Sequence, residues 1–238
     1  MDTSSIGTQR PITVVGHRGA RGHAPENTLR SFATAIEMGC QRVEMDVHLS
    51  RDGVPMIIHD GALDRTTNGT GPVAQRTHAE LRLLDAGGGE RIPTLGEVMD
   101  FCRGRVDIQI ELKDSRCPGT VADQILRDWG LERLVVTSFT LELLDEIAPR
   151  LPGVPLGLLN KDPARDMIGV ARNRGHRLIC PRSSIASPDQ IAQAHDAGLQ
   201  VYVFHVNTAD AAADAIRFRA DAIGTDYPDL VFRQLAGR

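Results

Sequence analysis

The chain has 238 residues, which suits one large domain or two small ones. Its 27 basic and 31 acidic residues give a formal net charge of −4, so we expect no binding of nucleic acid or of anionic membranes. Apolar residues make up 41% and charged residues 24%, which excludes disorder and fibrous repeats as the main state. No run approaches the ~20 apolar residues of a membrane span, and the polar first residues are unlike a signal peptide. The four cysteines are scattered without metal-site spacing, so we expect reduced thiols in a cytoplasmic protein.

Apolar runs typical of strands alternate with helical patterns along the chain. About eight strand–helix units predict an α/β fold, either a closed (β/α)₈ TIM barrel or a long doubly wound sheet. The predicted strands are 12–16, 42–48, 106–112, 134–138, 155–159, 177–180, 200–206 and 221–225. The predicted helices are 26–38, 94–103, 119–129, 140–149, 163–174, 188–197, 208–218 and 228–236. Residues typical of helix N-caps mark several starts, namely Asn27 or Thr28, Thr94, Thr140, Ser187 and Thr208.

A short hairpin interrupts the alternation after the second predicted strand. Only residues 50–53, with an Asp-Gly pair, separate two apolar runs, so the second run must return antiparallel. A two-residue turn would place His59 opposite Asp46, and a looser turn would place it opposite His48 or Leu49. We therefore expect the hairpin to return His59 to about the height of the acidic residues described below.

Residues 60–93 form a long polar segment that is rich in glycine. Loops of this length in a compact domain are usually functional or disordered. We interpret the segment as a small cap insertion over the mouth of the barrel, within a single domain that spans residues 1–238.

Charged side chains follow one face of two predicted strands. They are Glu44 and Asp46 in the strand 42–48, and Glu111 in the strand 106–112. Because side chains alternate along a strand, we expect the apolar sets to face the helices and the carboxylates to point into the barrel lumen. Three buried carboxylates need a neutralising partner, and their oxygens suit one divalent cation, Mg²⁺ or Ca²⁺. The alternative is an antiparallel edge strand whose charged face is exposed.

Two histidines are expected beside these carboxylates. His17 follows the first predicted strand, at the end of the barrel where such enzymes carry their chemistry, and His59 follows the hairpin. Imidazoles titrate near neutral pH, so the pair can serve as general base and general acid. Arg18 and Lys113 are suited to binding phosphate oxygens. Together with a cation, this set of residues indicates cleavage of a phosphodiester.

These residues lie in motifs that resemble the glycerophosphodiester phosphodiesterase family. The resemblance covers nearly the whole chain and is strongest in its first half. The motifs are His17-Arg18-Gly19, Pro25-Glu26-Asn27-Thr28, Glu44-Met45-Asp46-Val47, Asp52-Gly53-Val54-Pro55 followed by His59-Asp60, residues 65–71, Ile92-Pro93-Thr94-Leu95, Glu111-Leu112-Lys113 and residues 221–228.

The resemblance implies a barrel with an inserted cap that hydrolyses glycerophosphodiesters to glycerol 3-phosphate and an alcohol. In the family, either a glycerol hydroxyl or water attacks the phosphorus, and the sequence leaves both routes open. The site residues that the resemblance implies are Glu44, Asp46 and Glu111 for one divalent cation, His17 and His59 for acid–base catalysis, and Arg18 and Lys113 for the phosphate.

The sequence departs from the family after the seventh strand, where Phe204-His205 stands in place of the usual Trp-Thr. Phe204 still offers glycerol an apolar wall, with less area and no N–H donor. His205 is either a third polar contact in the mouth or a loop histidine. Asp60 is expected to orient His59, and Asp226 is expected to cap the last helix.

Three alternatives differ in function. The barrel could be a phospholipase-D-like enzyme that acts on lysophospholipids, a non-catalytic barrel that binds a phosphorylated ligand, or a barrel whose carboxylates only pair with Lys113 and Arg42. We favour a small-molecule glycerophosphodiester, because the insertion offers few apolar side chains for a lipid and because binding alone needs no pair of histidines. The head-group alcohol, the native metal and the choice between monomer and homo-oligomer stay open.

Overall fold

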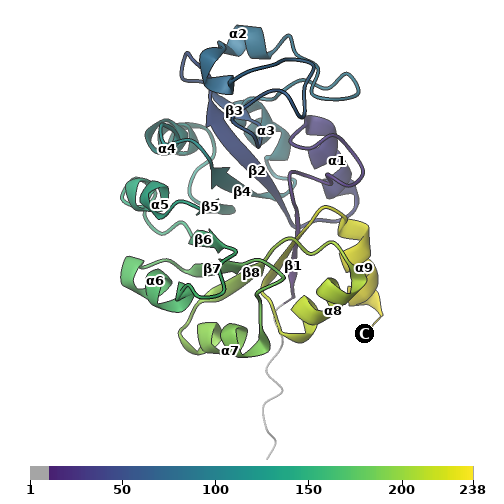
Figure 1. Ribbon diagram of the computed structural model, residues 1–238, viewed down its shortest axis with the longest axis vertical. Coiled ribbons are helices and arrows are strands. Elements are labelled where there is room, and N and C mark those ends of the chain that lie inside the picture. The colour runs from purple at the N-terminus through teal and green to yellow at the C-terminus, as the bar shows by residue number, and fades with distance from the viewer. Residues whose placement is uncertain (1–10, 238) are drawn as a thin grey trace, which may run out of the picture.

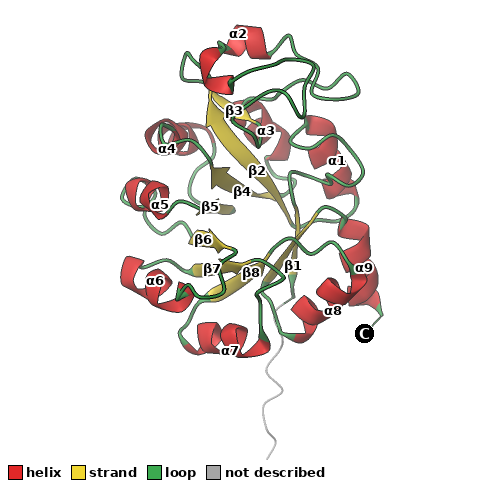
Figure 2. Cartoon of the chain, viewed as in Figure 1, coloured by secondary structure: helices red, strands yellow, loops and turns green. Residues whose placement is uncertain are grey.

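The hydrogen-bonded order of the strands closes on itself. The computed structural model describes residues 11–237, and strand β1 pairs with β2 on one side and with β9 on the other. The eight barrel strands are parallel, and helices surround them (Figures 1 and 2). The expected (β/α)₈ TIM barrel is confirmed, and the doubly wound sheet is excluded. In barrel order the strands are β1 (Thr13–Gly16), β2 (Arg42–Leu49), β4 (Asp107–Leu112), β5 (Leu134–Ser138), β6 (Leu156–Asn160), β7 (Leu178–Pro181), β8 (Gln200–Val203) and β9 (Ala222–Thr225).

Several helices begin directly after a residue whose side chain caps the first turn. Thr94, Ser187 and Thr208 each accept a hydrogen bond from the backbone N–H three residues further on. Two helices begin more than one residue later than expected, because Thr28 caps α1 and Asp166 caps α6. The helices are α1 (Leu29–Glu37), α2 (His78–Leu81), α3 (Leu95–Cys102), α4 (Cys117–Asp128), α5 (Leu141–Ile147), α6 (Met167–Arg174), α7 (Pro188–Asp196), α8 (Ala209–Arg217) and α9 (Pro228–Ala236). Within residues 11–237, no helix has the length and apolar character needed to cross a membrane.

Side-chain alternation divides the apolar core into two layers. Residues on the outer faces of the strands, such as Val43, Ile110 and Val136, pack with the helices in one continuous cluster. A smaller cluster of opposite parity fills the lumen and includes Val15 and Tyr202. The lower lumen is therefore a packed core, and polar chemistry is confined to the carboxyl ends of the strands.

The hairpin strand β3 (Pro55–Ile57) lies antiparallel on β2, as expected, but its turn is longer than two residues. Leu49 pairs with the first residue of β3, and the N–H of Ser50 donates to the carbonyl of Val54 (3.0 Å). Three residues then form the turn, and Gly53 adopts a left-handed φ of 80°. The Ser50 hydroxyl accepts the N–H of Val54 (2.8 Å), which favours this longer turn.

The longer turn moves His59 by one position relative to β2. The observed pairing places His59, by count, opposite Met45, so both expected alignments are wrong. The N–H of Ile58 donates to the carbonyl of Asp46 (3.0 Å). The hairpin therefore still returns His59 to the height of the acidic side chains.

Residues 60–93 extend outside the ring of helices, near α1 and α3 (Figure 1). They contain α2 and a short 3₁₀ helix, η1 (Val73–Gln75). Their apolar side chains pack against β3 in a small cluster that is separate from the barrel core. This cluster consists of Met56, Ile58, Leu63, Val73, Leu81 and Ile92.

Gly224 of β9 leaves space for the aromatic side chain of Tyr202, which lies in the lumen of the barrel. A Cβ at this position would lie 2.7 Å from Cζ of Tyr202, and Tyr202 is only 1% exposed. We expect Gly224→Ala to lower the free energy of unfolding by about 1–3 kcal/mol, because a packed core resists added volume. Urea denaturation measures the change.

Gly119→Ala in α4 is the matched control for this substitution. Its Cβ would meet only the flexible end of Arg150, at 3.6 Å, so we expect stability to be unchanged or slightly raised. Equal stability of Gly224→Ala and the wild type would contradict the packing described for the lumen.

Candidate active site

Three carboxylates meet where β2 and β4 approach the rim of the barrel. Asp46 and Glu111 are register partners, and Glu44 precedes Asp46 by two residues on the same face. One oxygen from each side chain lies within 4.8 Å of the other two. The exposed fractions are 2% for Glu44, 0% for Asp46 and 6% for Glu111, so the alternative of an exposed edge strand is wrong. The backbone N–H of Arg18 donates to Oε2 of Glu44 (2.9 Å) and ties β1 to this cluster.

Burial and mutual repulsion change how these carboxylates hold protons. Burial and the neighbouring Asp46 raise the pKa of Glu111 to about 7. Burial, Asp46 and Glu111 raise the pKa of Glu44 well above its usual range. Burial also opposes the ionisation of Asp46, but Arg18 and Lys113 lower its pKa to about 2. One carboxylate is thus held ionised, while the other two retain protons toward neutral pH unless a further positive charge joins them.

The donor atoms of this cluster fit a divalent cation. Oε1 of Glu44 and Oδ1 of Asp46 are buried and have no hydrogen-bond partner among residues 11–237. All three side chains offer carboxylate oxygens, which are ligands of Mg²⁺ and Ca²⁺ rather than the nitrogen and sulfur ligands that zinc favours. A cation would supply the positive charge that three buried carboxylates require.

Two cationic side chains border the carboxylates. Nζ of Lys113 donates to Oε1 of Glu111 (2.6 Å) and lies 3.5 Å from Oδ1 of Asp46. Nε of Arg18 lies 3.2 Å from Oδ2 of Asp46, and its Nη1 donates to Oε1 of Glu26 (2.7 Å). Arg18 and Lys113, which were predicted to bind the phosphate, therefore lie at the acidic cluster. Both already pair with carboxylates there.

His17 is held in place by the last strand of the barrel. Its backbone N–H donates to the carbonyl of Thr225 (2.9 Å), and its Nδ1 lies 2.5 Å from Oδ1 of Asp226. Nδ2 of Asn207 donates to the other carboxylate oxygen of Asp226 (2.8 Å). Burial alone would raise the pKa of Asp226, but the bond to His17 lowers it. The ionised carboxylate can only accept, so Nδ1 of His17 carries a proton and Nε2 is the nitrogen that can accept a further proton.

His59 has a carboxylate on the same ring atom. Its Nδ1 lies 2.5 Å from Oδ1 of Asp60, which is the contact expected of a residue that orients it. Nε of Arg65 donates to Oδ2 of Asp60 (2.6 Å) and holds the pKa of Asp60 below its usual range. The two Nη atoms of Arg65 donate to Glu26 (2.8 and 2.9 Å). Because Glu26 also binds Arg18, a continuous series of ion pairs links His59 to the acidic cluster.

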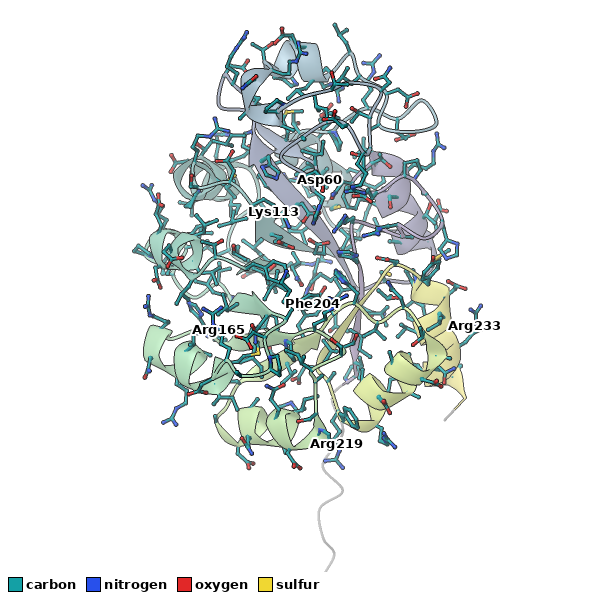
Figure 3. The ribbon with its side chains drawn as sticks, in the orientation of Figure 1. Asp60, Lys113, Arg165, Phe204, Arg219 and Arg233 are labelled. Carbon is teal, nitrogen blue, oxygen red and sulfur yellow. The ribbon has the colours of Figure 1, made fainter. Side chains whose placement is uncertain are left out.

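One pocket brings these groups together. Burial lowers the pKa of both His17 and His59, so both rings are neutral near pH 7. Figure 3 shows Lys113 and Phe204 near the centre of the ring of helices. The pocket is lined by the polar residues His17, Arg18, Glu44, His59, Gln109, Glu111 and His205, and by the apolar wall of Phe139, Leu159, Tyr202 and Phe204.

Sequence reasoning missed three residues of this arrangement, which are Asp226, Glu26 and Arg65. The expectation that Asp226 caps the last helix is wrong, because Tyr227 occupies the N-cap of α9 and no side chain bonds there. Glu26 and Arg65 were noticed only as parts of family-like motifs. Their one signal was opposite charge in two separate loops, and strand periodicity carries no information about such loops.

Comparisons with known sequences agree on one family. The family model described as Glycerophosphoryl diester phosphodiesterase family matches residues 17–230. A glycerophosphodiester phosphodiesterase of Caldanaerobacter subterraneus subsp. tengcongensis is 31% identical over 231 residues, which cover 92% of this chain and 95% of the relative.

Solved structures show the same relationship. An Oleispira antarctica phosphodiesterase in complex with the product sn-glycerol-3-phosphate has a TM-score of 0.89 and 28% identity, covering 94% of this chain and 96% of that one. A glycerophosphodiester phosphodiesterase from Agrobacterium tumefaciens has a TM-score of 0.83 and 30% identity, covering 93% and 99%. The chain therefore belongs to the glycerophosphoryl diester phosphodiesterase family of enzymes.

Proposed function

We propose that the protein hydrolyses glycerophosphodiesters to glycerol 3-phosphate and an alcohol, in a reaction that depends on one divalent cation. The observation that carries the proposal is a single pocket at which a buried carboxylate cluster meets two imidazoles, each with a carboxylate at Nδ1. Membership of the family supports the class of bond that is broken. The product bound to the Oleispira antarctica relative supports the glycerol phosphate half of the substrate.

Glu44, Asp46 and Glu111 would hold the cation, either Mg²⁺ or Ca²⁺. When bound, the cation would act as a Lewis acid toward a phosphoryl oxygen. Arg18 and Lys113 would bind the remaining phosphate oxygens, because both lie beside these carboxylates and Arg18 also lines the pocket.

His17 and His59 would divide the proton transfers. One ring would take the proton of the attacking hydroxyl, from glycerol or from water, and the other would give a proton to the oxygen of the leaving alcohol. Asp226 and Asp60 would orient the two rings and stabilise each imidazolium as it forms. The neutral resting state that burial favours suits the ring that acts as base.

We propose that the substrate is a small diester rather than a lipid. Phe204 would form the apolar wall for glycerol, and it is itself 3% exposed. Residues 60–93 would act as the cap, supplying Arg65 to the ion pairs behind His59. The four cysteines are free and buried, which supports a reducing, cytoplasmic location.

Removal of divalent cations should abolish the hydrolysis of small glycerophosphodiesters such as glycerophosphocholine. Release of glycerol 3-phosphate is measured after treatment with a chelator and again after Mg²⁺, Ca²⁺ or Mn²⁺ is restored. Full activity after chelation would remove the cation from the reaction. Faster turnover of a lysophospholipid than of any small diester in the same assay would favour the phospholipase-D-like alternative.

Cation binding should also change thermal stability, in a manner that depends on pH. Glu111 has a pKa of about 7, above its usual 4.5, so the folded protein retains a proton that the unfolded chain releases. Without a cation, this group makes stability fall as pH rises between these values. The cation must displace that proton, so the increase in Tm on adding Mg²⁺ or Ca²⁺ should grow from about pH 5 to about pH 8. Glu111→Gln should reduce the increase, and an increase independent of pH would contradict this assignment.

His17→Ala and His59→Ala should each lower kcat by ~10²–10⁴-fold, with a smaller effect on KM, because each removes a positioned acid or base. Steady-state kinetics measures both constants, and urea denaturation checks that the fold is retained. His195→Ala is the matched control, because this exposed histidine of α7 pairs with Asp221 outside the pocket. A kcat near the wild-type value would remove the substituted histidine from the mechanism.

A further inference from the structure

His205 occupies the reactive side of His17. Its Nε2 lies 3.0 Å from Nε2 of His17, and the two ring centroids are 4.1 Å apart. At this distance one hydrogen bond joins the two nitrogens. Because the proton of neutral His17 lies on Nδ1, His205 carries the shared hydrogen when both rings are neutral, and His17 carries it when His17 is protonated. The contact arises where the sequence departs from the family pattern, at Phe204-His205.

Neither ring nitrogen of His17 is free to meet solvent directly. Its Nδ1 lies on Asp226 and its Nε2 lies on His205, and the residue as a whole is 4% exposed. His205 is only partly buried and lines the same pocket. Among residues 11–237 its ring has one hydrogen-bond partner, which is His17. The series Asp226–His17–His205 therefore ends at Nδ1 of His205.

We propose that His205 is a proton-relay residue that resets the protonation of His17 between turnovers, an inference that rests on the acid–base role proposed for His17. When His17 holds a proton on Nε2, that proton passes to Nε2 of His205 while the Nδ1 proton of His205 leaves to water. In the reverse direction, an acid in solution protonates Nδ1 of His205, and the Nε2 proton of His205 moves to Nε2 of His17. In the first direction the N–H bonds at Nε2 of His17 and Nδ1 of His205 break, while one N–H bond forms at Nε2 of His205 and one O–H bond forms on water. The reverse direction remakes the same bonds, proton exchange of His205 with water restores its starting tautomer, and no electrons are exchanged.

The charges around His205 suit a ring that passes a proton on. Arg18 and Arg182 face it with positive charge, and Asp226 faces it with negative charge beyond His17. Burial and, next in size, the neighbouring His17 lower the pKa of His205 to about 3. A proton that arrives on His205 is thus transferred rather than retained.

Two variants separate a relay from a simple hydrogen-bond donor. His205→Gln keeps a side-chain N–H near His17 but cannot pass a proton through, and His205→Ala leaves space in the pocket. In dilute buffer both should lower kcat by about tenfold or more while KM changes by less than about twofold. Added imidazole should restore kcat in His205→Ala in proportion to its concentration, and should fail in His205→Gln, where the space is filled. His195→Ala should show neither the loss nor the rescue.

Three kinetic outcomes would overturn the relay. These are a wild-type kcat in His205→Gln, a change confined to KM, or no response of His205→Ala to imidazole. If the His205 variants keep full activity while His17→Ala loses it, the proposed function stands and the relay fails. If the wild type hydrolyses no diester, the proposed function itself fails.

A measurement without substrate tests the relay even if the wild type hydrolyses no diester. Exchange of the Nε2 proton of His17 with solvent can be followed by nuclear magnetic resonance. It should slow by about tenfold in His205→Gln, because the path through the outer ring is lost. Unchanged exchange would overturn the relay whatever the activity of the protein.

Discussion

The burial of three acidic side chains at one rim of the barrel is the constraint on which the rest of the site depends. Carboxylates removed from water need opposite charge, donated hydrogen bonds or protons. Asp46 obtains the first two from Arg18, Lys113 and the amide of Asn27 (2.9 Å), so it stays ionised. Glu44 and Glu111 obtain less and retain protons, and this imbalance is what a cation would relieve.

The two imidazoles reach the same local arrangement by different routes. His59 and its carboxylate partner are neighbours in sequence, and the hairpin delivers both to the rim together. His17 and Asp226 are separated by 209 positions and meet only because the first and last strands pair. In both cases a carboxylate lies at Nδ1 and leaves Nε2 as the nitrogen that can accept a proton, although one pair is local in sequence and the other is not.

Local features of the sequence were sufficient to predict much of the fold and the centre of the site. The charged faces of β2 and β4 follow from side-chain alternation, which is a property of the strand itself, so Glu44, Asp46 and Glu111 could be placed together. Asp226 could not be placed, because its contact joins the two ends of the chain and the Tyr-Pro that follows it is typical of a helix start. The hairpin was predicted, but the length of its turn was wrong, because a serine hydroxyl as well as the Asp-Gly pair determines that length.

The closure of β1 against β9 has a consequence for synthesis of the protein. β1 hydrogen-bonds to β2 and β9, and Asp226, the partner of His17, directly follows the last strand. Until β9 and Asp226 have been synthesised, one edge of β1 has no partner strand and Nδ1 of His17 has no carboxylate partner. A chain truncated before β9 therefore leaves one edge of β1 unpaired and leaves His17 without the carboxylate that contacts its Nδ1.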